Sequence, residues 1–390
     1  MKKSTYTPFI VIAILLLVLL AGKYTPLNTK SFFYAISLSI QSLLMAILPF
    51  LIFTFLFNSI ASFKKNAVIF LLLVMFCICL SNFTYTMIAY FFNSLNLMGE
   101  VKIITASKGK LEPYWTAMNL QIIPNNIALV AGIICGLSVN IIKKSDKLKN
   151  ISAKLVGISL FILNKIFIPI IPLFVLGFAF KLQHDEILVP ILKDYSIVLI
   201  NVLIPAILCL ALMYYVSNSC NAKKALSSIK NMLPAFLTGL TTMSGAAAIP
   251  SSLIASEKNT KNPTLCRSII PMTSNIHLLG DGFFIPMVSL AILTSFGYNI
   301  PDINHYLVFA LSFVLAKFAV AGVPAGGILA MLPVLKSTLG FDEEMLCLIM
   351  SIYIIFDPIT TSINVLGNGG FVMMIVKSYN KIQLNFLTSK

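Results

Sequence analysis

The chain has 390 residues, of which 58% are hydrophobic and only 11% are charged, and its mean hydropathy is +0.94. Soluble proteins carry charge on about a quarter of their residues. The composition therefore excludes a set of soluble domains, a coiled coil, a disordered chain and a disulfide scaffold. A transmembrane β-barrel would show alternation over about ten residues instead of long apolar runs. These exclusions leave an all-α polytopic membrane protein.

The formal net charge of +15 does not indicate a nucleic-acid partner. The basic residues lie mostly in short gaps between apolar runs, which is the distribution of membrane-loop charge. The seven cysteines lie mainly within apolar segments. They lack the spacing and neighbouring histidines of a metal site, so we expect no transition-metal site.

About 20 apolar residues cross a bilayer as a helix. The first qualifying run follows Met1-Lys2-Lys3, and because no signal-peptide cleavage pattern follows it, we expect a retained first helix. The runs are 8–22, 32–62, 67–94, 120–142, 155–180, 188–216, 264–295 and 345–376.

The linkers between these runs predict the orientation. Lysines cluster in alternate linkers and in both terminal segments, so the positive-inside rule predicts cytoplasmic termini and about eight crossings. We expect a multi-pass protein of a bacterial inner membrane. The lysines on the cytoplasmic side would be 2, 3, 64, 65, 143, 144, 147, 149, 154, 223, 224, 230, 258, 261, 377, 381 and 390.

Two further apolar regions, 225–257 and 303–338, each contain a break of small residues, at 241–248 and at 321–327. A single kinked span is one interpretation of each region. Counting either as a crossing would place Lys-rich linkers on opposite sides, so the charge pattern favours two re-entrant hairpins. Their tips must be buried in protein or line a cavity.

Each hairpin is followed by a span with a polar, glycine-containing middle, at 273–282 and at 361–370. A hairpin plus a broken span, present twice, is an internal repeat, and we expect the two copies to have inverted topology. Backbone groups freed by mid-membrane breaks are tolerated where they bind ions or polar substrates. The pattern therefore predicts a transporter with its binding site between the repeats.

Charged residues within the spans are functional candidates because a charge at membrane depth is costly. Asp357 and Asp281 meet this criterion, although a satisfied structural carboxylate or a helix cap would also explain them. His277 is interpreted either as a proton carrier or as a hydrogen-bonded core histidine. For Lys317 and Lys336 we expect side chains that extend to an interface.

Four motifs in order carry a family resemblance. They are the serine-containing first tip before Pro250, the stretch from Pro271 to Asn275-Ile276-His277, Ala321-Gly322-Val323-Pro324, and Asn364-Val365-x-Gly367. With these motifs the chain resembles the dicarboxylate/amino acid:cation symporters, which form the glutamate transporter family. The resemblance covers nearly the whole chain and is strongest from about 230 to 377.

The resemblance implies eight transmembrane helices, two hairpins and a homotrimer in which transport domains move as elevators. Scaffold helices 1–2 would occupy 1–66 and helices 4–5 would occupy 117–182. The transport domain would combine helix 3, at 67–95, with residues 187–378. Within the latter, helix 7 would span about 264–295 and helix 8 about 345–376.

The resemblance also implies roles for individual residues. Asp357 matches the carboxylate that holds the α-amino group of the substrate, Asn364 matches the contact to its α-carboxylate, and Thr361 matches a neighbouring hydroxyl. The hairpin tips would present backbone amides to the carboxylate. These tip residues are Ser244, Gly245, Gly322 and Val323.

Two departures from the family pattern concern the substrate. Thr360 stands where the family has an arginine that grips a side-chain carboxylate, and Met243 stands at an alternative arginine position. Arg267 is the only arginine of the chain and lies elsewhere. We therefore expect a neutral amino acid as substrate, with an acidic amino acid or dicarboxylate as the alternative.

The coupling ion stays open between Na⁺ and H⁺, and exchange without coupling is a further alternative. Asn368 matches a sodium-ligating aspartate, and a second family aspartate aligns with Leu279, or with Asp281 if a gap is allowed. The candidate cation ligands are Asn275, His277, Asp281, Asn364 and Asn368. No other cofactor is expected.

Two alternatives belong to other classes of function. An intramembrane enzyme is disfavoured because Ser244 has no adjacent base and no H-E-x-x-H or G-x-S-x-G motif is present. A channel is the second alternative. We expect a carrier that moves an amino acid with a cation through a lipid bilayer, and no enzymatic activity.

Overall fold

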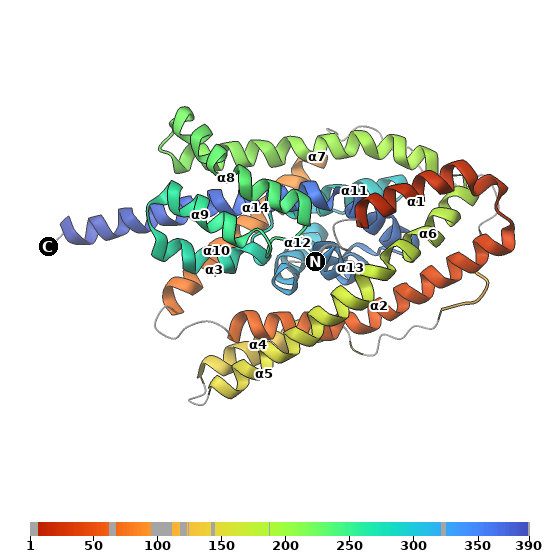
Figure 1. Ribbon diagram of the computed structural model, residues 1–390, viewed down its shortest axis with the longest axis horizontal. Helices are drawn as coiled ribbons and strands as arrows, with labels where there is room; N and C mark the ends of the chain where they lie inside the picture. The colour runs from red at the N-terminus through yellow and green to blue at the C-terminus, as the bar shows by residue number, and fades with distance from the viewer. Residues whose placement is uncertain are drawn as a thin grey trace.

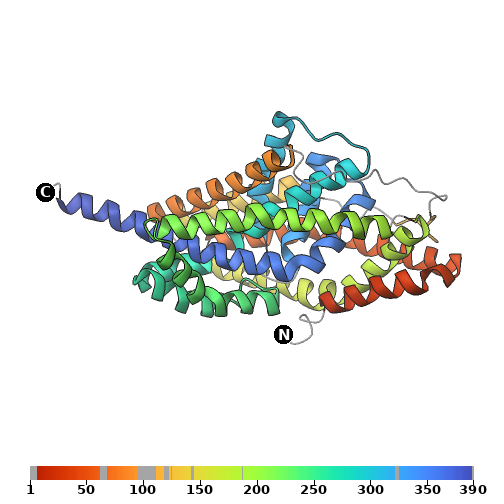
Figure 2. The same ribbon diagram turned by 90° about the horizontal axis from the view of Figure 1, so that it is seen from above.

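The computed structural model describes residues 7–61, 68–94, 111–117, 123, 125–141, 145–186, 188–320 and 325–388. Within these residues all regular secondary structure is helical (Figures 1 and 2). The all-α prediction is confirmed for this part of the chain. The C-terminal end of α14 extends beyond the rest of the helices.

One group of helices forms around α2. It comprises α1 (Thr7–Ala21), α2 (Leu27–Ala61), α4 (Asn125–Ile141), α5 (Ser145–Phe161) and α6 (Ile168–His184). A short 3-10 turn, η2 (Gly22–Tyr24), follows α1, and a π-helical segment, η4 (Ile162–Phe167), joins α5 to α6. The long helix α2 packs against α4, α5 and α6, and α1 packs against α6.

A glycine sets the closest approach within this group. A Cβ at Gly177 of α6 would collide with the carbonyl oxygen of Phe33 and the hydroxyl of Ser37, both on α2. That hydroxyl donates a 2.8 Å hydrogen bond to the carbonyl of Phe174. Small residues and hydroxyl bonds of this kind are how helices associate in lipid, where the hydrophobic effect gives no preference for helix contacts.

The remaining helices pack around α11 and α14. They are α3 (Val68–Ser94), α7 (Leu188–Ser217), α8 (Ala222–Thr242), α9 (Ile249–Thr260), α10 (Pro263–Ile276), α11 (Leu279–Ser295), α12 (Ile303–Ala316), α13 (Gly326–Leu339) and α14 (Glu343–Thr388). Helix α14 contacts α7, α8 and α11, and α11 contacts α3. The division into a scaffold and a moving domain stays a prediction.

Five helical stretches are long and apolar enough to cross a membrane. They are Leu73–Asn93, Lys147–Phe167, Ile197–Ser217, Pro263–Ser295 and Glu343–Lys381, found among the described residues. Four shorter apolar helical segments accompany them: Ala13–Tyr24, Val130–Val139, Ile303–Ala319 and Gly326–Leu339. Together with large exposed apolar side chains on most helices, these spans indicate an integral membrane protein. The number of crossings stays a prediction.

The predicted first hairpin folds back on itself. Asn221 caps the start of α8, accepting a hydrogen bond from the amide of Lys224. The helix ends at Met243, which adopts the left-handed conformation with φ of 51°. Helix α9 then packs against α8, and at the far end from the tip Asn231 donates a 2.7 Å bond to Asn259. A single kinked helix is therefore the wrong interpretation of this region.

The second hairpin is built in the same way. Asp302 caps α12 through the amides of Asn304 and His305, and these backbone hydrogen bonds, that of His305 first, lower the pKa of its carboxyl. Helix α12 passes into a 3-10 turn, η5 (Lys317–Ala319), before the tip. Helix α13 packs against α12, and His305 contacts the carbonyl of Thr338 at the open end.

The seventh predicted span is broken as expected. His277 and Leu278 have non-helical backbone conformations, with ψ angles of 93° and 82°, and they separate α10 from α11. The end of α8 at the first tip, the end of η5 before the second tip and this break therefore supply three interruptions in the part of the molecule packed around α14.

The prediction of a second broken span is wrong. Helix α14 runs without interruption through 361–370. Its glycines serve close packing: a Cβ at Gly369 would lie 2.6 Å from the methyl carbon of Met232, and one at Gly370 would lie 2.6 Å from the sulfur of Met213. The repeat therefore consists of two hairpins, each followed by a polar helix, of which only the first is broken.

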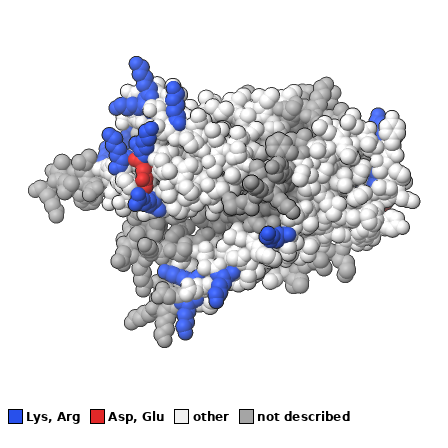
Figure 3. Space-filling view, viewed as in Figure 1, with Lys and Arg blue, Asp and Glu red and all other residues white. Residues whose placement is uncertain are grey.

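Charge is unevenly distributed along the molecule. The space-filling view shows Lys and Arg side chains gathered at one end, over the connection between α7 and α8, around α9, and near the start of α5 (Figure 3). This is the end that the positive-inside rule predicts to be cytoplasmic.

Candidate functional site

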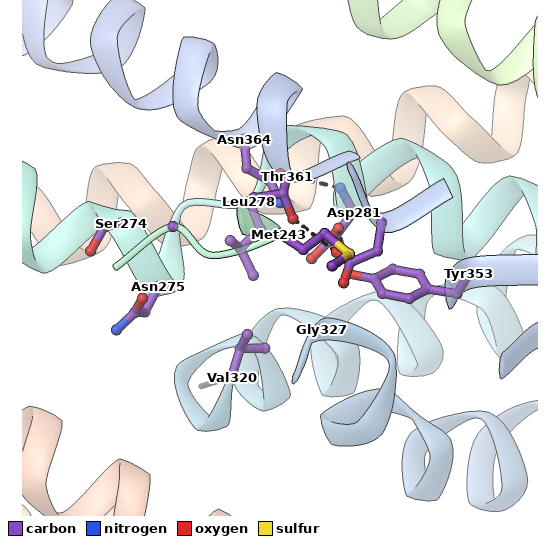
Figure 4. A pocket seen from close by; sticks show the side chains of 12 residues that line it. Met243, Ser274, Asn275, Leu278, Asp281, Val320, Gly327, Tyr353, Thr361 and Asn364 are labelled. Atoms are coloured by element: carbon purple, nitrogen blue, oxygen red, sulfur yellow. Dashed lines mark hydrogen bonds between the residues drawn. The ribbon is translucent and has the colours of Figure 1, made fainter. Parts of the chain in front are cut away.

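A cavity lies where the first hairpin tip, the break in the α10–α11 span, the second hairpin and α14 meet (Figure 4). Its empty volume is about 320 Å³, including open space at its mouth. Twelve residues line it: Met243, Gly245, Ser274, Asn275, Leu278, Asp281, Val320, Gly327, Tyr353, Asp357, Thr361 and Asn364. Met243 and Tyr353 extend into it from opposite sides.

Asp357 joins α14 to the second hairpin. Its side chain is 3% exposed. Oδ2 accepts a 2.7 Å hydrogen bond from the amide of Ala325, and Oδ1 accepts a 2.8 Å bond from the hydroxyl of Thr361. Ala325 immediately precedes α13, so the positive end of that helix dipole favours the carboxylate. The carboxylate is thereby fixed at the cavity wall by two donors.

Asp281 is the second buried acid of the cavity. It lies in the first turn of α11, and its Oδ1 accepts a 3.1 Å hydrogen bond from the hydroxyl of Tyr353. A Cβ at Gly327 would lie 2.5 Å from the Oδ2 atom of Asp281. Glycine is thus required at position 327 for the second hairpin to approach the side chains of Asp281 and Tyr353 so closely.

Asn364 binds the backbone amides at the start of α11 that have no partner within the helix. Its Oδ1 accepts a 2.7 Å hydrogen bond from the amide of Gly280 and a 3.3 Å bond from that of Asp281. The first amides of a helix have no partner within the helix. Asn364 on α14 therefore serves as the cap that Leu278, at the N-cap position, cannot provide.

The first hairpin tip touches α10 directly. A Cβ at Gly245 would lie 2.5 Å from the carbonyl oxygen of Ser274. Beside this contact, the Oδ1 atom of Asn275 is buried without a hydrogen-bond partner among the described residues. An unpaired buried acceptor is costly, which makes this oxygen a candidate ligand for a cation or a donor group of the substrate.

The cavity brings together seven of the residues proposed from the sequence: Asp357, Asn364, Thr361, Met243, Gly245, Asn275 and Asp281. Gly322 and Val323 lie outside the described residues. Thr360, Ser244, His277 and Asn368 do not line the cavity. The hydroxyl of Thr360 bonds back to its own helix, and that of Ser244 accepts from the amide of Ala247 within the tip.

His277 lies in a separate, fully buried network. Its Nδ1 contacts the Oδ1 atom of Asn368 at 3.1 Å, and its Nε2 contacts the hydroxyl of Ser81 at 3.0 Å. Its ring packs against Phe371 with ring centroids 4.3 Å apart. These are the contacts of a satisfied core histidine, and they connect α3, the helix break and α14.

Several residues that complete the site were not predicted from the sequence. Tyr353, Ser274, Leu278, Val320 and Gly327 also line the cavity. Asn82 of α3 spans the break: its Nδ2 donates 2.9 Å to the carbonyl of Ile276, and its Oδ1 accepts from the amide of Leu278. An asparagine within an apolar span is the signal that would have found it, by the reasoning applied to the acids.

The prediction that Lys317 extends to an interface is wrong. Its side chain is fully buried, and its ammonium donates to Asn82 Oδ1 at 3.1 Å and to the carbonyl of Leu278 at 3.0 Å. Lys336, in contrast, is exposed and pairs with Glu343 at 2.6 Å. The difference arises because Lys317 faces the polar helix break, where acceptors are available inside the protein.

Comparison with known proteins identifies the family. The model of the sodium:dicarboxylate symporter family matches residues 7–378. The chain belongs to this family. The family resemblance inferred from the four motifs is therefore confirmed, and the family is one of transporters rather than enzymes.

Individual relatives match only part of this chain. Excitatory amino acid transporter 1 of Ambystoma tigrinum is 27% identical over 172 residues, which is 44% of this chain and 31% of that protein. The excitatory amino acid transporter of Onchocerca volvulus is 27% identical over 189 residues, which is 48% of this chain and 37% of that protein. Excitatory amino acid transporter 3 of Mus musculus is 26% identical over 220 residues, which is 56% of this chain and 41% of that protein. The chain thus spans less than half the length of each of these relatives.

Proposed function

We propose that this protein is a secondary carrier that moves an amino acid together with a cation across the membrane, through the cavity at the hairpin tips. The single observation that carries the proposal is the fixed carboxylate of Asp357 in the wall of that cavity. It is positioned to bind an ammonium group, since a charge at membrane depth is retained where it serves transport or binding.

The other lining groups suit the rest of an amino acid. Half-helix N-termini favour anions, and α13 begins beside Asp357, so the second hairpin would receive the α-carboxylate. Thr361 and Asn364 lie on the same helix as Asp357, one and two turns further along. We assign Thr361 and Asn364 to the polar contacts around the α-carboxylate of the substrate.

The relatives favour an acidic amino acid as the substrate. All three are named excitatory amino acid transporters, and the family is named for dicarboxylates. This supports the second of the two substrates considered from the sequence. A neutral amino acid stays the second candidate because no basic side chain is among the residues that line the cavity. A buried side-chain carboxylate without a partner would be costly.

For the cation we assign Asn275 as the first ligand, because its Oδ1 is buried without a partner among the described residues. Sodium and similar hard cations prefer oxygen ligands, and the family name indicates sodium. His277 and Asn368 already satisfy each other, so they are weaker candidates. A homotrimer in a bacterial inner membrane, with both termini cytoplasmic and elevator-like movement, belongs to the same proposal.

The test is uptake into proteoliposomes. The purified protein would be reconstituted and given labelled aspartate or labelled alanine under an imposed Na⁺ gradient, an imposed pH gradient, or neither. Accumulation of aspartate under one gradient would identify an acidic amino acid carrier and its ion, and accumulation of alanine alone would select the second candidate. Equilibration without accumulation under either gradient would refute coupled transport.

A further inference from the structure

The ammonium of Lys317 occupies a site formed by oxygens. The side chain has no exposed surface and leaves the second hairpin at the start of η5, directly before the tip. Burial of an unpaired ammonium would be costly. The surroundings of the group therefore have to favour a positive charge, and the contacts show how they do so.

Two different segments supply the oxygens. The side-chain carbonyl of Asn82, on α3, lies 3.1 Å from Nζ, and the backbone carbonyl of Leu278, in the break between α10 and α11, lies 3.0 Å away. The Leu278 carbonyl also accepts the first hydrogen bond of α11, from Gly282, so its second lone pair receives the lysine.

The remaining sides of the ammonium are also adapted to it. The Phe313 ring lies with its centroid 4.9 Å from Nζ, which is a favourable arrangement for a cation. A Cβ at Gly282 would lie 3.0 Å from Nζ, so glycine leaves the space that the ammonium fills.

Carbonyl oxygens at a mid-membrane helix break are the ligands with which transporters coordinate free alkali cations. We propose that Lys317 is a tethered cation, which fills with its own ammonium a site that would otherwise bind a free alkali cation. The transporting part of the molecule would then hold this ammonium in the place of a free cation. The meaning of this charge for coupling rests on the proposed carrier function, whereas occupancy of the site does not.

The test measures cation binding without transport. The full-length protein and its Lys317→Ala variant would be titrated in detergent with NaCl or KCl, from about 1 to 300 mM, with choline chloride holding ionic strength constant. In the variant the oxygens of Asn82 and Leu278 lose their ammonium partner, and the space that the ammonium filled stays open. We expect its melting temperature to rise by about 2 °C or more beyond the rise of the wild type, saturably, in at least one of the two salts.

Two variants serve as controls. Lys317→Met removes the charge and fills the space, so it should show no added salt response, and Lys336→Ala removes an exposed lysine of the same hairpin and should behave as the wild type. An equal salt response in Lys317→Ala and the wild type would overturn the proposal. If Lys317→Ala and Lys317→Ser are both recovered unfolded in sodium and in potassium buffers, no free ion replaces the ammonium, which would also overturn it. A failed uptake experiment with a positive titration would refute the carrier alone.

Discussion

Replacement of Asp357 by Asn is the sharpest test of the binding site. The substitution preserves size and removes the charge that we assign to the substrate ammonium. In the free protein it also disturbs two hydrogen bonds, those from the amide of Ala325 at 2.7 Å and from the hydroxyl of Thr361 at 2.8 Å. The asparagine oxygen retains one of these donors, and its amide group faces the other.

Asp357→Asn has separate effects on substrate binding and on folding, and they differ in size. Removing one partner of a buried charge pair costs about 2–5 kcal/mol of binding free energy. At about 1.4 kcal/mol for each factor of ten, affinity should fall about 30-fold to 4,000-fold. The lost charged hydrogen bond costs about 1.5–3 kcal/mol of folding free energy, which lowers the melting temperature without preventing folding.

The assay is a substrate titration followed by thermal shift or by calorimetry, on protein whose size-exclusion profile matches the wild type. The matched control is Asp302→Asn, because Asp302 also accepts two hydrogen bonds, in its case both from backbone amides, but is exposed at the start of α12. That control should bind substrate normally. Wild-type affinity in Asp357→Asn would refute the assignment of this carboxylate to the ammonium group.

Three further outcomes are expected. Gly177→Ala should lower stability by about 1–3 kcal/mol in thermal melts, because its Cβ meets the α2 backbone. Gly157→Ala has open space around its Cβ and should be neutral or stabilising. Equal effects of the two substitutions would contradict the packing argument. Asn364→Ala should leave two amides of α11 uncapped and cost about 0.5–2 kcal/mol together with substrate affinity, and calorimetry showing neither loss would argue against its capping role. Thr360→Arg should raise the affinity for aspartate relative to alanine in competition binding, and an unchanged ratio would count against the arginine argument.

The fold was predicted from the sequence best where local chemistry decides it. The break at 241–248 was predicted from its cluster of Thr, Ser, Gly and Ala residues, and the structure places a left-handed Met243 and a returning helix there. The break at His277 and Leu278 was predicted from the same kind of signal. Polar and glycine residues in an apolar run indicated correctly that something other than lipid faces them.

The same signal misled where the neighbour decides the role of a glycine. Gly369 and Gly370 resemble a break in composition, but they lie in a continuous helix against Met232 and Met213. Lys317 was misplaced for a related reason: its acceptors, Asn82 and Leu278, lie far away in the sequence. Such long-range contacts determine the site, and single-sequence patterns do not contain them.

Both hairpins are fastened at their bases as well as packed along their lengths, through Asn231 with Asn259 in the first and His305 with Thr338 in the second. Fastening at the base prevents the two arms from spreading apart. A hairpin that moved as one body would keep these contacts. If the second hairpin moved away from α14, the amide of Ala325 would leave Asp357, so the cavity would open and its carboxylate would lose a hydrogen bond in the same movement.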